Sequence, residues 1–391
     1  MSNEPTHLDG SEWDVGVIGA GPAGSAVATQ LAAAGHRVLL TDKQRMPRAK
    51  VCGGCLGAVG HEALGRIEGV SELRFRRAAL ETVQIRSGDR GVRLSIGERA
   101  AIDRAEFDAA LTDHAARHGA QTAFAWRSSI GPATDAFRLL TLSHADGRAA
   151  RVRCRAIVIA AGLGSAALLP AAERPATITR RASRVGVGVT IEDRSSAYPA
   201  GEIVMATSRS GDGYVGIVRL PDGRLDLAAA LAPRSVSLAS ISAVVRRVLS
   251  EACSPVPSGL DDAQWQATPR LTQRPRRLGA ARVLLVGDAA GYVEPFTGEG
   301  IGWALRSAVA AAPLVAEAVN AWRPRLVDEW EKTHRAAVGG QHSRCRLVCG
   351  AVGGRLVTPW VVRALAAAPW LAGPIVRSID PRPGATVLAS S

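Results

Sequence analysis

A short glycine-rich segment near the amino terminus has the composition of a loop that binds a phosphate group. The segment Gly19-Ala20-Gly21-Pro22-Ala23-Gly24 lies between an apolar stretch, 14–18, and an Ala-rich stretch, 22–34. Glycines let the backbone approach a pyrophosphate, and the first turn of the following helix supplies N–H donors. Asp42 closes the next apolar run, where a carboxylate accepts hydrogen bonds from an adenosine ribose. The spacing therefore predicts a dinucleotide site.

A second motif lies in the last third of the sequence. The apolar run 282–286 ends in Gly287-Asp288, and the turn 295–299 leads into a long helical stretch, 300–320. A strand that ends in Gly-Asp places a carboxylate at the carboxyl edge of a sheet, where ligands bind. The amino terminus of the long helix would stabilise negative charge on a bound group. The two motifs together favour a nucleotide cofactor over glycine turns without a ligand.

These motifs, with Arg104 in the segment 102–108, resemble a flavoprotein family. That family contains para-hydroxybenzoate-hydroxylase-type monooxygenases, flavin-dependent halogenases and geranylgeranyl reductases. The resemblance covers residues 14–320 and implies an α/β fold. This fold is a Rossmann-like FAD-binding domain of the GR2 type, with an inserted antiparallel β-sheet substrate domain and a helical C-terminal region.

The resemblance also implies which residues hold FAD. Asp288 would bind the ribityl and pyrophosphate region, Arg104 would contact the cofactor, and 298–301 would face the pyrimidine edge of the flavin. The expected cofactor-binding residues are Gly19, Gly21, Ala23, Gly24, Asp42, Lys43, Lys50, Cys52, Gly53, Arg104, Gly162, Asp288, Gly298, Gly300 and Ile301.

The loop Lys50-Val51-Cys52-Gly53-Gly54 resembles the Lys-x-Cys-Gly-Gly loop of the geranylgeranyl-reductase branch. The Gly-Glu-Ser and Trp-x-Trp-x-Ile-Pro signatures of the halogenases are absent from the sequence. Cys52 and Cys55 also have the spacing of a redox disulfide or a zinc site. Because no histidine has ligand spacing and the family loop carries no metal, we expect small packing residues here and no metal site.

Two departures from the family pattern bear on the reductant and the substrate. Ala161 stands where the hydroxylase branch has an Asp associated with FAD and NAD(P)H, so NAD(P)H is expected only as a transient reductant that this motif does not secure. The strand 213–221 keeps only Tyr214 and Pro221 of the aromatic strand of the reductase branch, which argues against a standard polyprenyl pocket. No catalytic residue is identified; the candidates for the pocket, each better suited to packing than to catalysis, are Tyr214, Arg219, Trp265, Tyr292 and Phe296.

The elements that must position these residues alternate along the chain. A strand, a helix and a strand over 14–40 form a βαβ unit, and glycine-spaced β segments between 183 and 232 indicate an inserted antiparallel sheet. Asp103 and Glu106 have the spacing of a capping box at the start of a helix over 103–118. The expected parts are an FAD-binding domain over 12–75, 100–180 and 275–322, a substrate domain over 76–99 and 181–274, and a helical region over 323–391.

Composition limits the partners. Lys and Arg number 48 against 35 Asp and Glu, a net charge of +13, but the cations are scattered, so nucleic-acid binding is not expected. The six cysteines and the absence of a long apolar run or leader predict a cytoplasmic protein. The segment 355–377 contains Trp360, Trp370 and three arginines but no acid. It could lie on an anionic membrane, cap a lipophilic pocket or pack on the FAD-binding domain.

The leading functional hypothesis is an FAD-dependent monooxygenase that uses dioxygen to hydroxylate an aromatic or lipophilic small molecule in secondary or lipid metabolism. The alternative is a geranylgeranyl-reductase-like ene-reductase that acts on a prenyl or other isolated double bond. A third hypothesis is a flavin-binding redox sensor without turnover. At the start of the long helix, Glu299 carries the same charge sign as a reduced flavin, so we expect its side chain to turn outward.

Overall fold

The chain begins with the βαβ unit that its apolar pattern predicts. β1 (Glu12–Ile18) and β2 (Val38–Asp42) are buried along most of their length, as strands covered on both faces are, and α1 (Pro22–Ala33) connects them. Pro22 begins α1, where a missing N–H costs nothing, and Gly35 follows its end with a φ of 87°. The computed structural model describes residues 7–296, 298–352 and 358–368.

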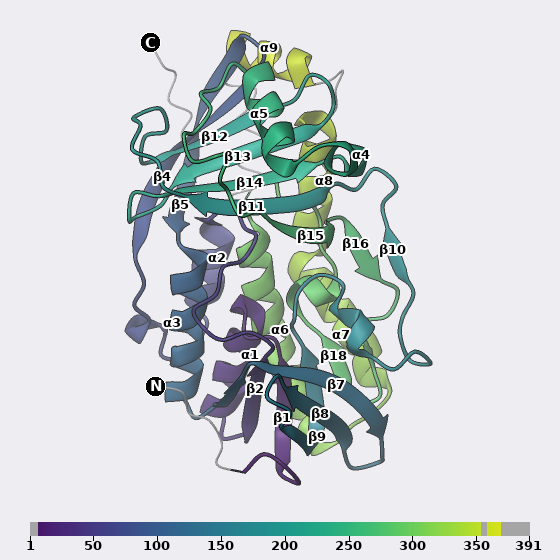
Figure 1. Ribbon diagram of the computed structural model, residues 1–391. Coiled ribbons are helices and arrows are strands. Elements are labelled where there is room, and N and C mark those ends of the chain that lie inside the picture. Colours follow the sequence, from purple (N-terminus) through teal and green to yellow (C-terminus); the bar gives the residue numbers. More distant parts are fainter. Residues whose placement is uncertain (1–6, 297, 353–357, 369–391) are drawn as a thin grey trace.

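The first sheet has the strand order β17-β18-β9-β1-β2-β6, and its pairs from β18 to β6 are parallel. β8 extends it by antiparallel pairing with β9, and β7 pairs antiparallel with β8. Its remaining strands are β6 (Gln121–Phe124), β7 (Trp126–Ala133), β8 (Arg138–His144), β9 (Ala149–Ile159), β17 (Gly279–Ala280) and β18 (Val283–Leu285). Two helices in contact with each other, α1 and α6 (Gly300–Asn320), pack against this sheet, and α3 (Arg104–Arg117) packs on α1 (Figure 1).

The second sheet has the order β15-β11-β14-β13-β12-β4-β5-β3 and is antiparallel except where β12 pairs with β4. Its strands are β3 (Cys55–Leu56), β4 (Arg77–Ser87), β5 (Arg90–Ile102), β11 (Val185–Ile191), β12 (Glu202–Thr207), β13 (Gly213–Arg219), β14 (Leu225–Leu231) and β15 (Gln266–Arg270). A two-stranded ribbon of β10 (Thr177–Thr179) and β16 (Gln273–Pro275) lies beside the two sheets (Figure 1).

The two faces of the second sheet differ in composition because side chains alternate along a strand. The outer face packs its Val, Leu and Ile residues against α5 (Ile241–Glu251). The opposite face, called the inner face here, is directed at the first sheet, and α2 (Ala58–Leu64) and α6 lie on that side (Figure 1). Along β11, β13 and β14 the inner face is mainly small, with Gly186, Gly188, Gly216, Ala228 and Ala230 beside Thr190, Tyr214, Val218 and Asp226. The strands β4, β5 and β12 place larger apolar residues on it, namely Ile85, Val92, Leu94, Ile203 and Met205.

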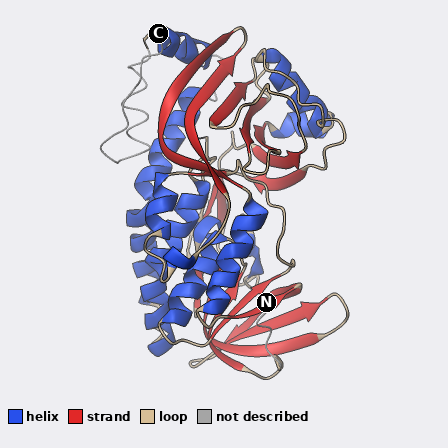
Figure 2. Ribbon diagram, turned by 90° about the vertical axis from the view of Figure 1, so that its left-hand side faces the viewer, coloured by secondary structure: helices blue, strands red, loops and turns tan. Residues whose placement is uncertain are grey.

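Helices line one side of the molecule (Figure 2), and the helical C-terminal region extends from the first sheet to the second (Figure 1). α7 (Arg325–His334) continues through a π-helical turn, Arg335–Gly339, into α8 (Gly340–Val352), and α9 (Thr358–Ala367) follows. α9 packs on β4 and β5, and its Leu365 joins an apolar cluster with Tyr214 of the inner face. The described part of 355–377 thus lies on the second sheet, whereas Trp370 lies outside the described residues.

Several local features differ from the predicted pattern. Asp103 does cap α3 by accepting from Ala105 N, but Glu106 binds Arg76 and does not complete a capping box. After β14 the chain forms two short helices, α4 (Pro233–Leu238) and α5, and the Ser240 side chain caps α5 by accepting from Ala243 N. Within the described residues, no helix combines the length and apolar character that crossing a membrane requires.

Candidate functional site

The glycine loop joins β1 to α1 at the carboxyl edge of the first sheet. Gly19 has a φ of 103°, and a Cβ there would lie 2.6 Å from Cα of Ala161 on the neighbouring strand connection. A Cβ at Gly24 would lie 1.8 Å from the Gly19 carbonyl oxygen, so both positions exclude any side chain. In the described structure no side chain caps the amino terminus of α1, which leaves its first N–H groups for a bound anion.

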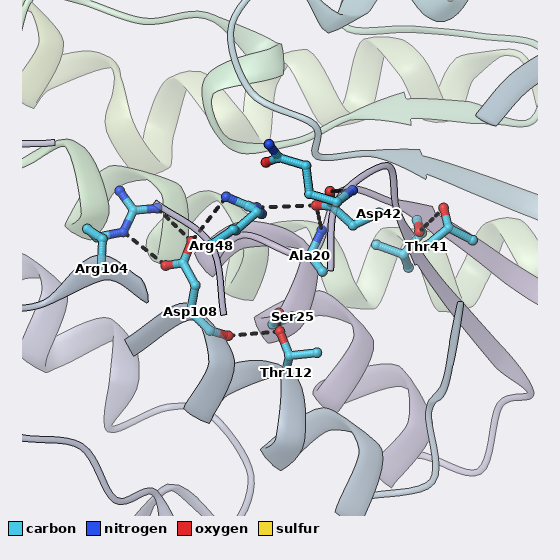
Figure 3. A network of polar contacts seen from close by, with 10 residues as sticks. Ala20, Ser25, Thr41, Asp42, Arg48, Arg104, Asp108 and Thr112 are labelled. Carbon is cyan, nitrogen blue, oxygen red and sulfur yellow. Dashed lines mark hydrogen bonds and ion pairs between the residues drawn. The ribbon is translucent and has the colours of Figure 1, made fainter. Parts of the chain in front are cut away.

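A chain of charged side chains adjoins this loop (Figure 3). Oδ2 of Asp42 accepts hydrogen bonds from Ala20 N at 2.9 Å and from Arg48 Nη2 at 3.2 Å. Arg48 also lies 3.6 Å from the fully buried Asp108, which binds Nε and Nη2 of Arg104 at 2.9 Å each. Asp42 therefore holds the loop and Arg48 together at the place where a ribose was expected.

The charge distribution fits a diphosphate. The Arg48 guanidinium lies above the loop, with Nη2 3.7 Å from where a Cβ on Gly21 would be, and its buried Nε has no hydrogen-bond partner within the described parts of the chain. The Arg48 guanidinium and the uncapped N–H groups at the amino terminus of α1 together supply the positive charge and the hydrogen-bond donors that bind a pyrophosphate. These residues would hold the diphosphate of FAD. Sequence reasoning missed Arg48, because nothing in its local sequence distinguishes it from a surface arginine.

The second motif meets the first one directly. A Cβ on Gly287, whose φ is 64°, would lie 2.7 Å from Cβ of Ala23 in the first turn of α1. The next residue, Asp288, is half-buried, and burial raises the pKa of its carboxyl to about 6 although Arg104 and Lys50 oppose that shift. A Cβ on Gly162 would lie 3.8 Å from Nζ of Lys50. The structure thus brings these predicted residues together, whereas Lys43 is exposed.

The loop Lys50–Gly54 lies against the inner face of the second sheet. A Cβ on Gly188 would lie 3.2 Å from Cα of Val51, and one on Gly53 would lie 3.8 Å from Ala228. A Cβ on Gly54 would lie 2.9 Å from Oδ2 of Asp226. The close contacts mean that this loop is held between the cofactor side of the molecule and the second sheet.

None of the six cysteines forms a disulfide in the described structure, and all except the exposed Cys253 are buried or half-buried. Burial raises the pKa of Cys52, and it raises that of Cys55 to about 11, so neither is poised as a thiolate. Cys345 and Cys349 both donate to the Glu294 carbonyl, with their sulfur atoms 3.9 Å apart. Among the described residues, no cluster of His, Cys, Asp and Glu has the arrangement of a metal site.

The prediction for Glu299 is wrong: its side chain does not turn outward to solvent. It is 2% exposed, and its Oε1 lies 2.7 Å from Nη1 of the equally buried Arg99 on β5. The carboxylate lies against Gly57, the residue that precedes α2, and near Gly302 in the first turn of α6. Two helix amino termini and one guanidinium therefore compensate the buried charge.

The pocket candidates separate into two groups. Tyr214 and Phe296 are 4.9 Å apart between ring centroids, and both join Tyr292 in the apolar cluster that α9 covers. Arg219 and Trp265 do not line that pocket, which corrects the prediction. Arg219 points from the outer face and binds the loop 193–198 through carbonyls and Asp193, and Trp265 donates to Ser242 on α5.

The turn before α6 is packed tightly. A Cβ on Gly298 would lie 3.2 Å from Sγ of Cys55, and one on Gly300 would lie 2.9 Å from the Tyr292 hydroxyl. Ile301 is buried in the first turn of α6, whose amino terminus has no side-chain cap in the described structure. The predicted site residues 298–301 therefore adjoin the Lys50–Gly54 loop through Cys55.

Two groups of titratable residues were not predicted for this site. His334 and His342 line one narrow gap together with Asp288, Tyr292 and Trp303, and burial lowers the pKa of His334 to about 4 and that of His342 to about 3. Asp226 lies on the inner face, 8% exposed, and burial raises its pKa to about 7. The histidines come from the C-terminal helices, so only tertiary structure places them here.

The chain is similar in sequence to two reductases. The chain is 27% identical over 347 residues to digeranylgeranylglycerophospholipid reductase 1 of Methanothermobacter thermautotrophicus, covering 85% of each. It is 27% identical over 366 residues to menaquinone reductase of Mycobacterium tuberculosis, covering 81% of this chain and 80% of the relative.

Solved structures share the fold. A myxobacterial chondrochloren halogenase superposes with a TM-score of 0.73 at 20% identity over 95% of this chain and 92% of its own. A geranylgeranyl bacteriochlorophyll reductase-like protein of Thermoplasma acidophilum gives 0.71 at 19% identity over 94% and 100%. The fold class predicted from the sequence is thereby confirmed.

The family described as FAD binding domain matches residues 12–343, which include every element of both sheets. The chain therefore belongs to this family of FAD-dependent oxidoreductases, within the superfamily of para-hydroxybenzoate hydroxylase and geranylgeranyl reductase.

Proposed function

We propose that the chain is an FAD-dependent reductase that saturates an isolated C=C bond in a lipophilic, isoprenoid-like substrate. The observation that carries the proposal is the contact between the Lys50–Gly54 loop and the small residues of the inner face. The small residues let this loop pack closely against the second sheet, and the apolar cluster beside it would accept a lipophilic substrate. The names of the two reductase relatives support the same substrate class.

Different residues of the chain would bind FAD and shield the substrate from water. When bound, reduced FAD supplies two electrons as a hydride. Arg48 and the amino terminus of α1 would hold its diphosphate, and Asp288 would hold the ribityl region. Tyr214, Phe296 and Leu365 would exclude water from the substrate, because they form one apolar cluster next to the inner face.

A monooxygenase is the second candidate, and the aromatic pair favours it. The rings of Tyr214 and Phe296 meet edge to face at 76°, an arrangement that accepts a third aromatic ring at its side. A substrate with an electron-rich ring would then take the place of the isoprenoid, with dioxygen as co-substrate.

Turnover with and without dioxygen distinguishes the two. The holoprotein, reduced with dithionite, is incubated anaerobically with polyprenols and, in a second series, aerobically with phenols and a reductant. A reductase gives product two mass units heavier than the polyprenol without dioxygen. A monooxygenase is inactive there and adds one oxygen atom to a phenol in air, which would reject the first proposal. A flavin-loaded protein that turns over neither panel would favour the redox-sensor hypothesis.

Three further parts of the proposal concern partners and location. A transient nicotinamide nucleotide would reduce the flavin, and bleaching of the flavin absorbance by NADH or NADPH tests this. We also propose a cytoplasmic enzyme that contacts a membrane peripherally through 355–377, since that segment combines arginines with apolar residues. Co-sedimentation with anionic vesicles, compared with neutral ones, tests the contact.

A further inference from the structure

Asp226 stands out on the inner face because nothing around it pairs with its charge directly. Its Oδ1 accepts one hydrogen bond, from the Thr190 hydroxyl at 3.2 Å on the neighbouring strand β11. Its Oδ2 is buried and has no hydrogen-bond partner within the residues that the structure describes. That oxygen lies against Gly54, where even a Cβ would come within 2.9 Å. The flavin-side loop therefore covers an unsatisfied carboxyl oxygen.

The Lys50–Gly54 loop is held by fewer backbone hydrogen bonds than β14, the strand that carries Asp226. β14, which carries Asp226, pairs along its whole length with β11 on one side and β13 on the other. The loop is fixed near Gly54 by one backbone bond, from Ile102 N to the Gly54 carbonyl at 2.8 Å, and by the two-residue strand β3. If water must reach the carboxyl group, lifting the loop costs less than opening the sheet.

The charged and titratable groups that act on Asp226 come from three places. Arg104 and Asp103 lie at the start of α3, Arg224 begins the turn into β14, and Cys52 lies on the loop itself. Arg224 is already bound to Asp103 at 2.5 Å, and Arg104 to Asp108. The two arginines therefore compensate other carboxylates first, and the charged form of Asp226 remains poorly compensated.

We propose that Asp226 is a positioning residue that couples the docking of the Lys50–Gly54 loop to protonation: the neutral acid keeps the loop against the inner face, and the carboxylate releases it. The step is an acid dissociation in which the O–H bond of Asp226 breaks and the proton goes to solvent. The inference holds for either reaction considered above, because it concerns the loop and not the substrate.

The direction with pH follows from burial. Burial raises the pKa of Asp226 to about 7, so the group is neutral below that value and the loop is docked. Above it, the buried charge costs free energy that release of the loop relieves. The Thr190 hydrogen bond lowers this pKa, so removing the hydroxyl should move the transition to higher pH.

Hydrogen exchange of the loop amides, followed by mass spectrometry in the FAD-loaded protein, tests the proposal without any substrate. After correction for intrinsic rates, protection of 50–55 should fall by up to about tenfold per pH unit above pH 7, since one proton is lost. Asp226→Asn, neutral at every pH, should keep the loop protected. Thr190→Val should shift the loss of amide protection to higher pH. It also tests the proposal if Asp226→Asn does not fold.

Asp212→Asn is the matched control, because Asp212 is a buried aspartate of the same sheet region whose partners, Ser210, Ser235 and Arg247, lie away from the loop. It should show the wild-type pH dependence. A wild-type loop whose protection does not change with pH, or a fall that persists in Asp226→Asn, would overturn the inference. Failure of alkene reduction would reject the proposed function and leave these exchange results unaffected.

Discussion

The two sheets of this protein differ in how their faces are covered. The strands of the parallel sheet are buried on both faces, and their carboxyl ends present glycine, Asp42 and Asp288 to one place. The second sheet fills its outer face with large apolar side chains, whereas β11 and β14 place Gly, Ala, Thr190 and Asp226 on the inner one. The first arrangement brings backbone groups to the place where FAD would bind, and the second lets the Lys50–Gly54 loop pack closely on the inner face.

Glycine has a different structural role beside each sheet: Gly24 lies in the first turn of α1, next to the parallel sheet, and Gly216 lies on β13 of the second sheet. At Gly24 a side chain would collide with backbone that cannot move, whereas at Gly216 it would meet the flexible Met205 side chain at 3.0 Å. The comparison predicts that substitutions in the first sheet affect folding and flavin content, and that those on the inner face affect the substrate.

The largest expected effect is that of Gly24→Ala. Its Cβ would lie 1.8 Å from the Gly19 carbonyl oxygen, so the loop must deform and the protein should lose nearly all bound flavin. The matched variant Gly216→Ala should keep flavin content within about 20% and lose at most about 1 kcal/mol of unfolding free energy, since Met205 can change rotamer. Flavin absorbance per chain and denaturant unfolding measure both. Equal flavin loss in the two variants would contradict the distinction between the sheets.

Glu299→Gln tests the ion pair that joins the sheets. Arg99 comes from the second sheet and Glu299 from the start of α6, so the change removes the carboxylate charge from a buried ion pair. It should cost about 3 kcal/mol of unfolding free energy. Glu62→Gln, which breaks the exposed pair with Arg66, is the control and should change stability by less than about 0.5 kcal/mol. Similar values for both would mean that the buried pair contributes no more than a surface pair.

Asp288→Asn should weaken FAD binding by about 10- to 100-fold, the loss of one charged hydrogen bond. Without FAD, the same substitution should stabilise the protein. The pKa of Asp288 in the folded protein, about 6, lies above the usual aspartate value, so the stability of the wild type falls as the pH rises from that usual value to about 6. The apoprotein of the variant should therefore be the more stable one at pH 7, and this difference should vanish below pH 4. Fluorescence titration with FAD and thermal unfolding at several pH values measure the two effects, and unchanged affinity would remove Asp288 from the site.

The smallest effect is expected for Cys55→Ser. Cys55 is buried against Gly298, and its thiol is protonated at neutral pH because burial raises its pKa to about 11. A serine of similar size should leave flavin content and turnover within about threefold, because no thiolate chemistry is lost. A thiol count that changes when the flavin is reduced, or zinc found by elemental analysis, would show that the CxxC spacing has a redox or metal role after all.

Much of the fold could be predicted because its signals are local. The strands 185–191 and 225–231 and the helix 300–320 have the bounds that alternation and glycine spacing indicate. The fold class follows from the βαβ unit and the inserted sheet. Glu299 could not be predicted in this way, since the residue that holds it, Arg99, is 200 positions away in sequence.

The wrong placement of Arg219 in the pocket could have been avoided from the sequence. Tyr214 and Arg219 lie on the same strand, five positions apart, so alternation places their side chains on opposite faces and only one can face the pocket. The inward position of Asp226 follows from the same alternation once Leu225 and Leu227 are assigned to the outer face. Arg48 has no such signal, because it lies in a loop.

The order of strands in the parallel sheet has a consequence for how the protein is made. β9 separates β1 from β18, and β18 is contributed by residues 283–285. A ribosome has synthesised almost three quarters of the chain before that strand emerges, so β1 and β9 pair early while their neighbour is missing. The second sheet, whose β4 to β15 are contained within residues 77–270, can pair before β18 is available. The parallel sheet is thus expected to be completed last, when β18 adds to β9 beside a second sheet that has already formed.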